Sequence, residues 1–178
     1  MFNRLLPLPL AAAFLMGCST VRHPPMPTVP HVDLDRFMGD WYVLGGILTW
    51  LERGAHNAVE TYERRPDGSI QTTFSFRRGG FDGPEKVYRP RGFVLDDDTN
   101  ARWGMRFVWP VKADYRIVHL DEAYTRTIVG RQKRDYAWIM ARTPEIPEAE
   151  WDELVGVLAA LGYEPDSVVR VPQRWPDP

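Results

Sequence analysis

The sequence predicts an all-β domain, a barrel or a sandwich, that ends in one amphipathic helix and a last short strand. From Asp40 to Arg142, short segments alternate apolar and polar residues and are separated by turn signals, as regularly spaced strands do. The chain has seven Trp, seven Tyr and eight Phe, which suit half-buried strands. After residue 144 the apolar period changes to that of a helix.

Length and composition exclude several classes of protein. A chain of 178 residues has the length of one domain. Its net charge of −2 provides no broad positive field for a phosphate backbone, so we expect no nucleic-acid partner. Its single cysteine excludes an internal disulfide and a Cys-based zinc site, and we expect no bound metal or cofactor.

Residues 1–17 have the features of a secretory signal peptide: a charged start, a short apolar run and a small residue at the end. The run is too short to span a bilayer. Leu15, Gly17 and Cys18 resemble the lipobox of bacterial lipoproteins, whose cysteine is lipidated and becomes the first mature residue. Ser19 follows the cysteine in place of an Asp, which, by resemblance to enterobacterial lipoproteins, implies forwarding to the outer membrane. We therefore expect a lipid anchor on Cys18 and a domain on the periplasmic face.

Residues 18–31 are predicted to be the lipidated cysteine followed by a tether. Prolines at positions 24, 25, 27 and 30 favour an extended, semi-rigid chain that would hold a domain off the membrane. The folded domain is then expected at residues 32–175.

The clearest hairpin joins residues 57–65 to residues 70–78. Its turn contains Pro66, Asp67 and Gly68, which respectively preset φ, bond the local backbone and accept a positive φ. Apolar and polar residues alternate in the second arm, so one face is apolar and the other polar. This predicts two antiparallel strands against a core.

The same alternation continues along the chain and gives about eight strands before residue 144. It recurs in residues 101–109, 113–121, 124–132 and 135–143, and in the first of these Trp103, Met105, Phe107 and Trp109 share a face. The acidic residues 96–98 are predicted to form a solvated turn, with a calcium site as the less favoured alternative.

The predicted helix begins near Pro147 and ends near Gly162. Trp151, Leu154 and Leu158 recur at helical spacing, which predicts an apolar face packed on the outside of the sheet. Residues 167–173 then read as one more short strand.

Three motifs occur in the order found in the lipocalin family. The stretch DLDRFMGDWY contains Gly39 and Trp41, ADYRIVHLD contains Asp114 and Tyr115, and WIMARTP contains Arg142. The chain most resembles the bacterial outer-membrane lipoprotein lipocalins over residues 32–175. The resemblance implies an eight-stranded antiparallel up-and-down barrel, closed so that no edge strand remains, with a cup at one end.

The resemblance also implies structural roles for these motif residues. In lipocalins the residue matching Trp41 lies across the closed end of the barrel, and the residue matching Arg142 covers it. A guanidinium on an indole face contributes about 0.5–2 kcal/mol. We therefore expect Gly39, Trp41 and Arg142 to form a plug, with Asp114 and Tyr115 as further structural motif residues.

The predicted cup is lined by the inward-facing residues of the strands. They are Tyr62, Phe74, Phe76, Trp103, Met105, Phe107, Tyr115, Tyr136, Trp138 and Met140. Such a lining favours an acyl chain, and the resemblance implies a fatty acid or lysophospholipid. For each residue the alternative is simple filling of the barrel interior.

Two positions depart from the pattern of the resembling proteins. Glu60 falls in the inward set of its strand, so either the alternation is out of phase there or an acidic group enters the cup. An anionic fatty acid would then be disfavoured unless a cation lies near its carboxylate. Gly45 and Gly46 stand where an arginine is common in those proteins.

Three functions are compatible with this reading. The favoured one is a membrane-anchored, non-enzymatic protein that binds, stores or carries lipids in the cell envelope. The second is an enzyme on the same barrel, for which the only domain histidines, His56 and His119, lack a recognisable nucleophile arrangement. The third is an envelope adaptor with a filled barrel and an exposed apolar patch. A homodimer remains open.

Overall fold

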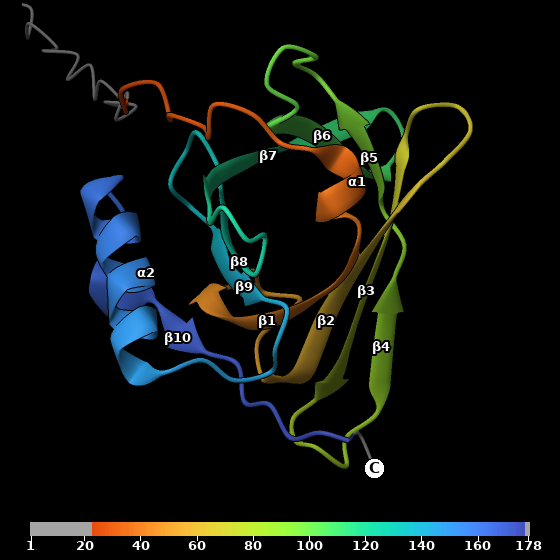
Figure 1. The fold of residues 1–178 in the computed structure, drawn as a ribbon. Coiled ribbons are helices and arrows are strands. Elements are labelled where there is room, and N and C mark those ends of the chain that lie inside the picture. Colours follow the sequence, from red (N-terminus) through yellow and green to blue (C-terminus); the bar gives the residue numbers. More distant parts are fainter. Residues whose placement is uncertain (1–22, 177–178) are drawn as a thin grey trace, which may run out of the picture.

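Antiparallel strands follow one another around a closed barrel in the computed structural model, which describes residues 23–176 (Figure 1). The barrel strands are β1 (Gly39–Ile47), β2 (Ala55–Arg64), β3 (Ile70–Arg78), β4 (Glu85–Tyr88), β5 (Arg91–Val94), β6 (Arg102–Val108), β7 (Val111–Leu120), β8 (Arg126–Gly130) and β9 (Ala137–Ala141). Because β4 and β5 both pair with β3, they share one position, and the barrel has eight. Pairing of β1 with β9 closes it, so the predicted eight-stranded barrel is confirmed.

The C-terminal elements pack on the outer wall. Helix α2 (Glu148–Ala160) buries Trp151, Leu154 and Leu158 in a cluster with outward-facing barrel residues such as Ile128 and Ile139. A 3-10 turn, η1 (Pro165–Ser167), leads to β10 (Val169–Arg170), which pairs with β1. The predicted helix and last strand are confirmed. Among the described helices, none is long and apolar enough to cross a bilayer.

Gly45 and Gly46 permit this close packing against β1. A Cβ on Gly45 would lie 2.4 Å from the carbonyl oxygen of Val169 and 2.5 Å from the Trp151 ring. A Cβ on Gly46, where φ is +149°, would lie 2.0 Å from the carbonyl oxygen of Ala137. The two glycines therefore let β9, β10 and α2 approach one strand from several sides.

The loops of the barrel fall into two groups, one at its open mouth and one at its closed end. The mouth loops are residues 48–54, 79–84, 109–110 and 131–136. The closed end contains α1 (Leu34–Phe37) and residues 65–69, 95–101 and 121–125. Since the strands alternate in direction, consecutive loops fall at opposite ends.

Arg142 and Trp41 seal the closed end. The Arg142 guanidinium carbon lies 3.8 Å from the centre of the Trp41 ring. The guanidinium also donates hydrogen bonds of 2.6–3.0 Å to the backbone oxygens of Arg36, Phe37, Met38 and Asp40. Gly39 begins β1 beside this guanidinium, with a φ of +91°. The side chain thus fastens α1 across the barrel end.

Residues 23–32, the N-terminal segment, are extended and lie along the outside of the barrel before α1 (Figure 1). The backbone N–H of Met26 donates to Oε1 of Gln132 at 2.8 Å, and that of Val29 donates to the carbonyl of Ile117 at 3.0 Å. Met26 and Val32 are buried. Residues 24–31 of the tether expected at residues 18–31 therefore lie against the barrel, attached through Met26 and Val29, although their four prolines are exposed. Cys18 and the predicted signal peptide lie outside the described residues.

The alternation predicted for residues 101–109 fails at its end. The pairing of β6 with β7 shifts register between Met105 and Val108, and β6 ends at Val108. Trp109 is therefore 78% exposed at the hairpin tip, where the sequence pattern predicts an inward face. A bulge changes which face a side chain occupies, and two-residue periodicity cannot detect it.

Candidate functional site

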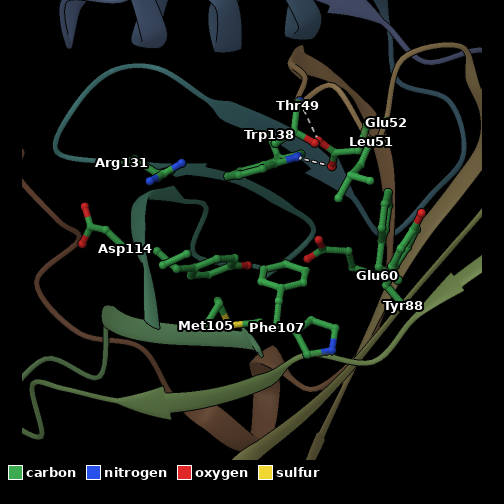
Figure 2. Close-up of a pocket in the computed structure, with 14 residues that line it drawn as sticks. Thr49, Leu51, Glu52, Glu60, Tyr88, Met105, Phe107, Asp114, Arg131 and Trp138 are labelled. Carbon is green, nitrogen blue, oxygen red and sulfur yellow. Dashed lines mark hydrogen bonds between the residues drawn. The ribbon is translucent and has the colours of Figure 1, made fainter. Parts of the chain in front are cut away.

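A cavity of about 160 Å³ opens between the mouth loops and extends into the barrel (Figure 2). Its lining comes from six barrel strands and from loops at the mouth. The lining residues are Thr49, Leu51, Glu52, Glu60, Phe74, Tyr88, Pro90, Met105, Phe107, Ala113, Asp114, Tyr115, Arg131 and Trp138. Most of the surface that they offer is aromatic or aliphatic, which suits an apolar ligand.

Five of the ten residues predicted to line the cup lie on this cavity. They are Phe74, Met105, Phe107, Tyr115 and Trp138. Phe107 stands at the entrance, where 58% of it is exposed, whereas Phe74, Met105 and Tyr115 are buried. The structure thus brings together aromatic side chains from β3, β6, β7 and β9.

The other five predicted residues lie away from the cavity surface. Tyr62 and Trp103 fill the barrel beneath the cavity, with ring centres 5.8 Å apart, and Trp103 stacks on Tyr115 at 5.3 Å. Phe76 and Met140 are packed in the same buried cluster. Tyr136 is half-buried in a mouth loop, outside the lining. Alternation identified which residues of a strand face the barrel interior. It carries no information about how far along the barrel axis each residue lies from the mouth.

The first mouth loop supplies lining residues that sequence reasoning missed. Glu52 is only 5% exposed, although it lies in the loop between β1 and β2. Its Oε1 accepts a 2.7 Å hydrogen bond from Nε1 of Trp138, and its Oε2 accepts one of 2.7 Å from the Thr49 backbone N–H (Figure 2). The loop therefore folds into the mouth. Strand periodicity gives no signal for such a loop.

Glu60 projects into the cavity, so of the two possibilities for this residue the acidic group enters the cup. Its Oε2 is inaccessible and has no hydrogen-bond partner among residues 23–176. Burial raises the pKa of Glu60 from 4.5 to about 8, and the nearby Glu52 carboxylate contributes to the rise. Near neutral pH the group is mostly a neutral carboxylic acid.

A pair of tyrosine hydroxyls completes the polar part of the barrel interior. The hydroxyl oxygens of Tyr62 and Tyr115 lie 2.6 Å apart. Burial, with a contribution from Glu60, raises the pKa of Tyr115 well above its usual value. The Tyr115 hydroxyl therefore stays protonated, so the inner end of the cavity contains polar groups with little charge.

A cation stands at the outer part of the cavity. Arg131 lines the mouth, and its Nε has no hydrogen-bond partner within the described part of the chain. Its Nη1 lies 3.4 Å from Asp135. Across from it, Asp114 accepts from Nε of Arg116 at 3.0 Å and from the Gln132 backbone N–H at 2.7 Å. Asp114 is thus paired with Arg116 and Arg131 with Asp135, and the buried Nε of Arg131 is left without an acceptor among the described residues.

The domain histidines are not brought together. His56 lies in β2, with its ring centre 4.9 Å from that of Phe81, and His119 lies in β7, which is not a neighbour of β2. Among the described residues, no group of three His, Cys, Asp or Glu side chains could hold a metal ion. The acidic residues 96–98 belong to a closed-end loop, in which Asp96 accepts a hydrogen bond from Thr99.

Comparison with known proteins shows which family, relatives and solved structures this chain resembles. The family model described as "Lipocalin-like domain" matches residues 32–173. The outer membrane lipoprotein Blc of Escherichia coli K12 is 29% identical over 177 residues, covering 96% of this chain and 98% of that protein. Temperature-induced lipocalin-1 of Arabidopsis thaliana is 25% identical, covering 83% of each. Insecticyanin of Manduca sexta has a similar structure, with a TM-score of 0.68 and 13% identity over 87% of this chain and 88% of that one.

Proposed function

Because the chain belongs to the lipocalin-like domain family, we propose that it binds single-chain lipids, a fatty acid or a lysophospholipid, inside its barrel. The apolar cavity beneath the mouth carries this proposal. Its volume of about 160 Å³ is below the roughly 300 Å³ at which pockets for drug-sized ligands begin, so the cavity accommodates part of one slender chain and not a bulky ligand. An open cavity also supports lipid binding over an adaptor with a filled barrel.

The polar groups give the ligand an orientation. Among the lining residues that the structure describes, Arg131 is the one cation, and it lies toward the mouth. The deeper part of the cavity around Glu60 therefore offers an anionic headgroup no compensating positive charge. A carboxylate or phosphate beside a guanidinium is favourable, and a methylene chain gains about 0.8 kcal/mol per buried CH₂. The acyl chain therefore enters first and the headgroup remains near Arg131.

The proposal includes a lipid anchor on Cys18 in the outer membrane, with residues 1–17 removed as a signal peptide. Its support is the lipobox-like Leu15, Gly17 and Cys18, together with relatives named outer membrane lipoprotein Blc that match 93–96% of this chain. Several acyl chains on one cysteine would give durable membrane binding. The protein would bind and carry lipids within the envelope.

Binding is tested with the chain from Ser19 onward, purified without detergent and titrated with lysophospholipid and with palmitate. We expect saturable quenching of tryptophan fluorescence at a ratio near one to one, because Trp138 lines the cavity. A short-chain diol, which has no long apolar chain, serves as the control and should not change the tryptophan fluorescence. Absence of binding for both lipid classes would contradict the proposal.

The Glu60→Gln substitution is expected to change how stability depends on pH. The folded chain holds a proton on Glu60 up to about pH 8, and the unfolded chain loses it near 4.5. The free energy of unfolding should therefore fall as pH rises from about 5 to 8, by a few kcal/mol at about 1.4 kcal/mol per pKa unit. Glu60→Gln should remove this loss and be the more stable protein at pH 8. Urea denaturation at pH 5 and pH 8 measures the free energy of unfolding of the wild type and Glu60→Gln. Glu63→Gln, on the exposed side of β2, is the control. Equal pH dependence in wild type and Glu60→Gln would show that Glu60 is not buried as described.

A further inference from the structure

The N-terminal segment leaves the barrel at its mouth. The carbonyl oxygen of Pro24 accepts hydrogen bonds from Nη1 of Arg134 at 2.8 Å and from Nε2 of Gln132 at 3.0 Å. Both side chains belong to the mouth loop of residues 131–136. From there the segment runs toward the closed end, where the backbone N–H of Val32 donates to the carbonyl of Thr99.

The distance from this point to the anchor is short. Five peptide units join His23 to Cys18, and they span at most about 18 Å. A ten-residue strand such as β7 is about 30 Å long. A lipid on Cys18 can therefore reach the surroundings of the mouth, while the closed end lies beyond its reach.

Large apolar side chains surround the same opening. Trp50 is 69% exposed in the first mouth loop. Phe107, Val108, Trp109 and Val111 are 58–78% exposed at the tip of the β6–β7 hairpin. We call these five residues the mouth rim. Exposed apolar groups gathered in one place mark interaction surfaces, and tryptophan is favoured at the boundary between lipid and water.

Charge differs between the two ends. The exposed basic residues Arg53, Lys112 and Lys133 lie at or next to the mouth, and the exposed acidic residues Asp82 and Asp135 lie there too. Counting Arg53, Arg131, Lys133 and Arg134 against Glu52, Asp82 and Asp135, the four mouth loops have a net charge of +1. Closed-end loops are acidic, with Asp96, Asp97 and Asp98 in one and Asp121 and Glu122 in another. An anionic phospholipid surface attracts the basic residues of the mouth and repels the acidic closed-end loops.

We propose that the mouth faces the membrane that holds the anchor, with the mouth rim seated among the headgroups of an anionic phospholipid bilayer. This orientation rests on the proposed lipid anchor at Cys18. The short link, the apolar rim and the charge asymmetry all favour the same orientation. A single-chain lipid then passes between bilayer and cavity without crossing open water, since Phe107 belongs to both the rim and the cavity lining.

The test uses the lipidated chain that begins at Cys18, in vesicles of phosphatidylethanolamine and phosphatidylglycerol with brominated acyl chains, which quench nearby tryptophans. Intact mass first verifies the lipid on Cys18, and a chain without it would remove the basis of the orientation. We expect clear quenching in the wild type and loss of at least half of the quenched signal in the double variant Trp50→Phe and Trp109→Phe. The matched control is Trp175→Phe, because Trp175 is 37% exposed on the outer wall against Tyr42. The Trp175→Phe variant should show the same quenching of tryptophan fluorescence as the wild type.

Two results would overturn the proposal. One is quenching in the double variant equal to that of the wild type, with thermal unfolding unchanged in both. The other is an unquenched wild type that elutes as a dimer and dissociates in the double variant, because the rim would then join two copies of the chain. Palmitate and lysophospholipid titrations of the same proteins keep a failure of orientation distinct from a failure of lipid binding.

Discussion

Replacing Ala113 by tryptophan is expected to weaken lipid binding by about 100-fold. Ala113 lines the cavity from β7, opposite Met105 in the pairing with β6, and an indole there would occupy much of a space of about 160 Å³. Displacing three or four methylenes of the ligand costs about 3 kcal/mol at 0.8 kcal/mol each, which corresponds to roughly 100-fold in Kd. Titration of tryptophan fluorescence with palmitate measures the change.

The matched control for this substitution is Val87→Trp. Val87 lies on β4, is 38% exposed and is not a lining residue. The Val87→Trp substitution therefore adds the same indole ring outside the cavity. The affinity of Val87→Trp for palmitate should stay within about twofold of the wild-type value. Wild-type affinity in a folded Ala113→Trp protein would place the lipid somewhere other than this cavity.

Substituting Arg142 by alanine is expected to lower the free energy of unfolding by about 3 kcal/mol. The guanidinium covers Trp41 and donates to several backbone oxygens of α1 and the start of β1. A hydrogen bond to a charged group contributes about 1.5–3 kcal/mol, and the loss of several leaves carbonyls at the closed end without their donor. Urea denaturation measures the change as a lower midpoint with the slope unchanged.

Lysine at position 142 separates charge from geometry. It keeps a cation over Trp41 but cannot present the planar fork of donors that reaches three consecutive carbonyls. We expect Arg142→Lys to recover less than half of the lost stability. Full stability in Arg142→Ala would mean that α1 is held mainly by its apolar contacts, such as those of the buried Phe37.

Periodicity explains why the fold could be predicted so fully from the sequence. Alternation in Ile70–Arg78 places Phe74 and Phe76 inside, and helical spacing of Trp151, Leu154 and Leu158 places α2 outside. These signals are repeated along each element, so one exception does not change the outcome.

The candidate site was predicted less completely, for physical reasons that differ by residue. Trp103 and Tyr115 both face inward, but only Tyr115 reaches the cavity, because depth along the barrel axis depends on which side chains fill its interior. Glu52 enters the mouth through a loop without periodicity. Residues 23–32 pack through hydrogen bonds to Gln132 and Ile117, which are more than 80 positions away in the chain.

Closure of the barrel by its first and last strands has a consequence for secretion. Gly46 pairs with Trp138, and β1 also pairs with β10 near the end of the chain. A wall that needs both ends of the sequence cannot be completed while the later strands are still inside the cell, and such long-range pairing is slow to form. In the export that we propose for residues 1–17, the barrel would therefore close only after translocation is nearly finished. A substitution that weakens the β1–β9 seam should then leave translocation intact and increase degradation in the periplasm.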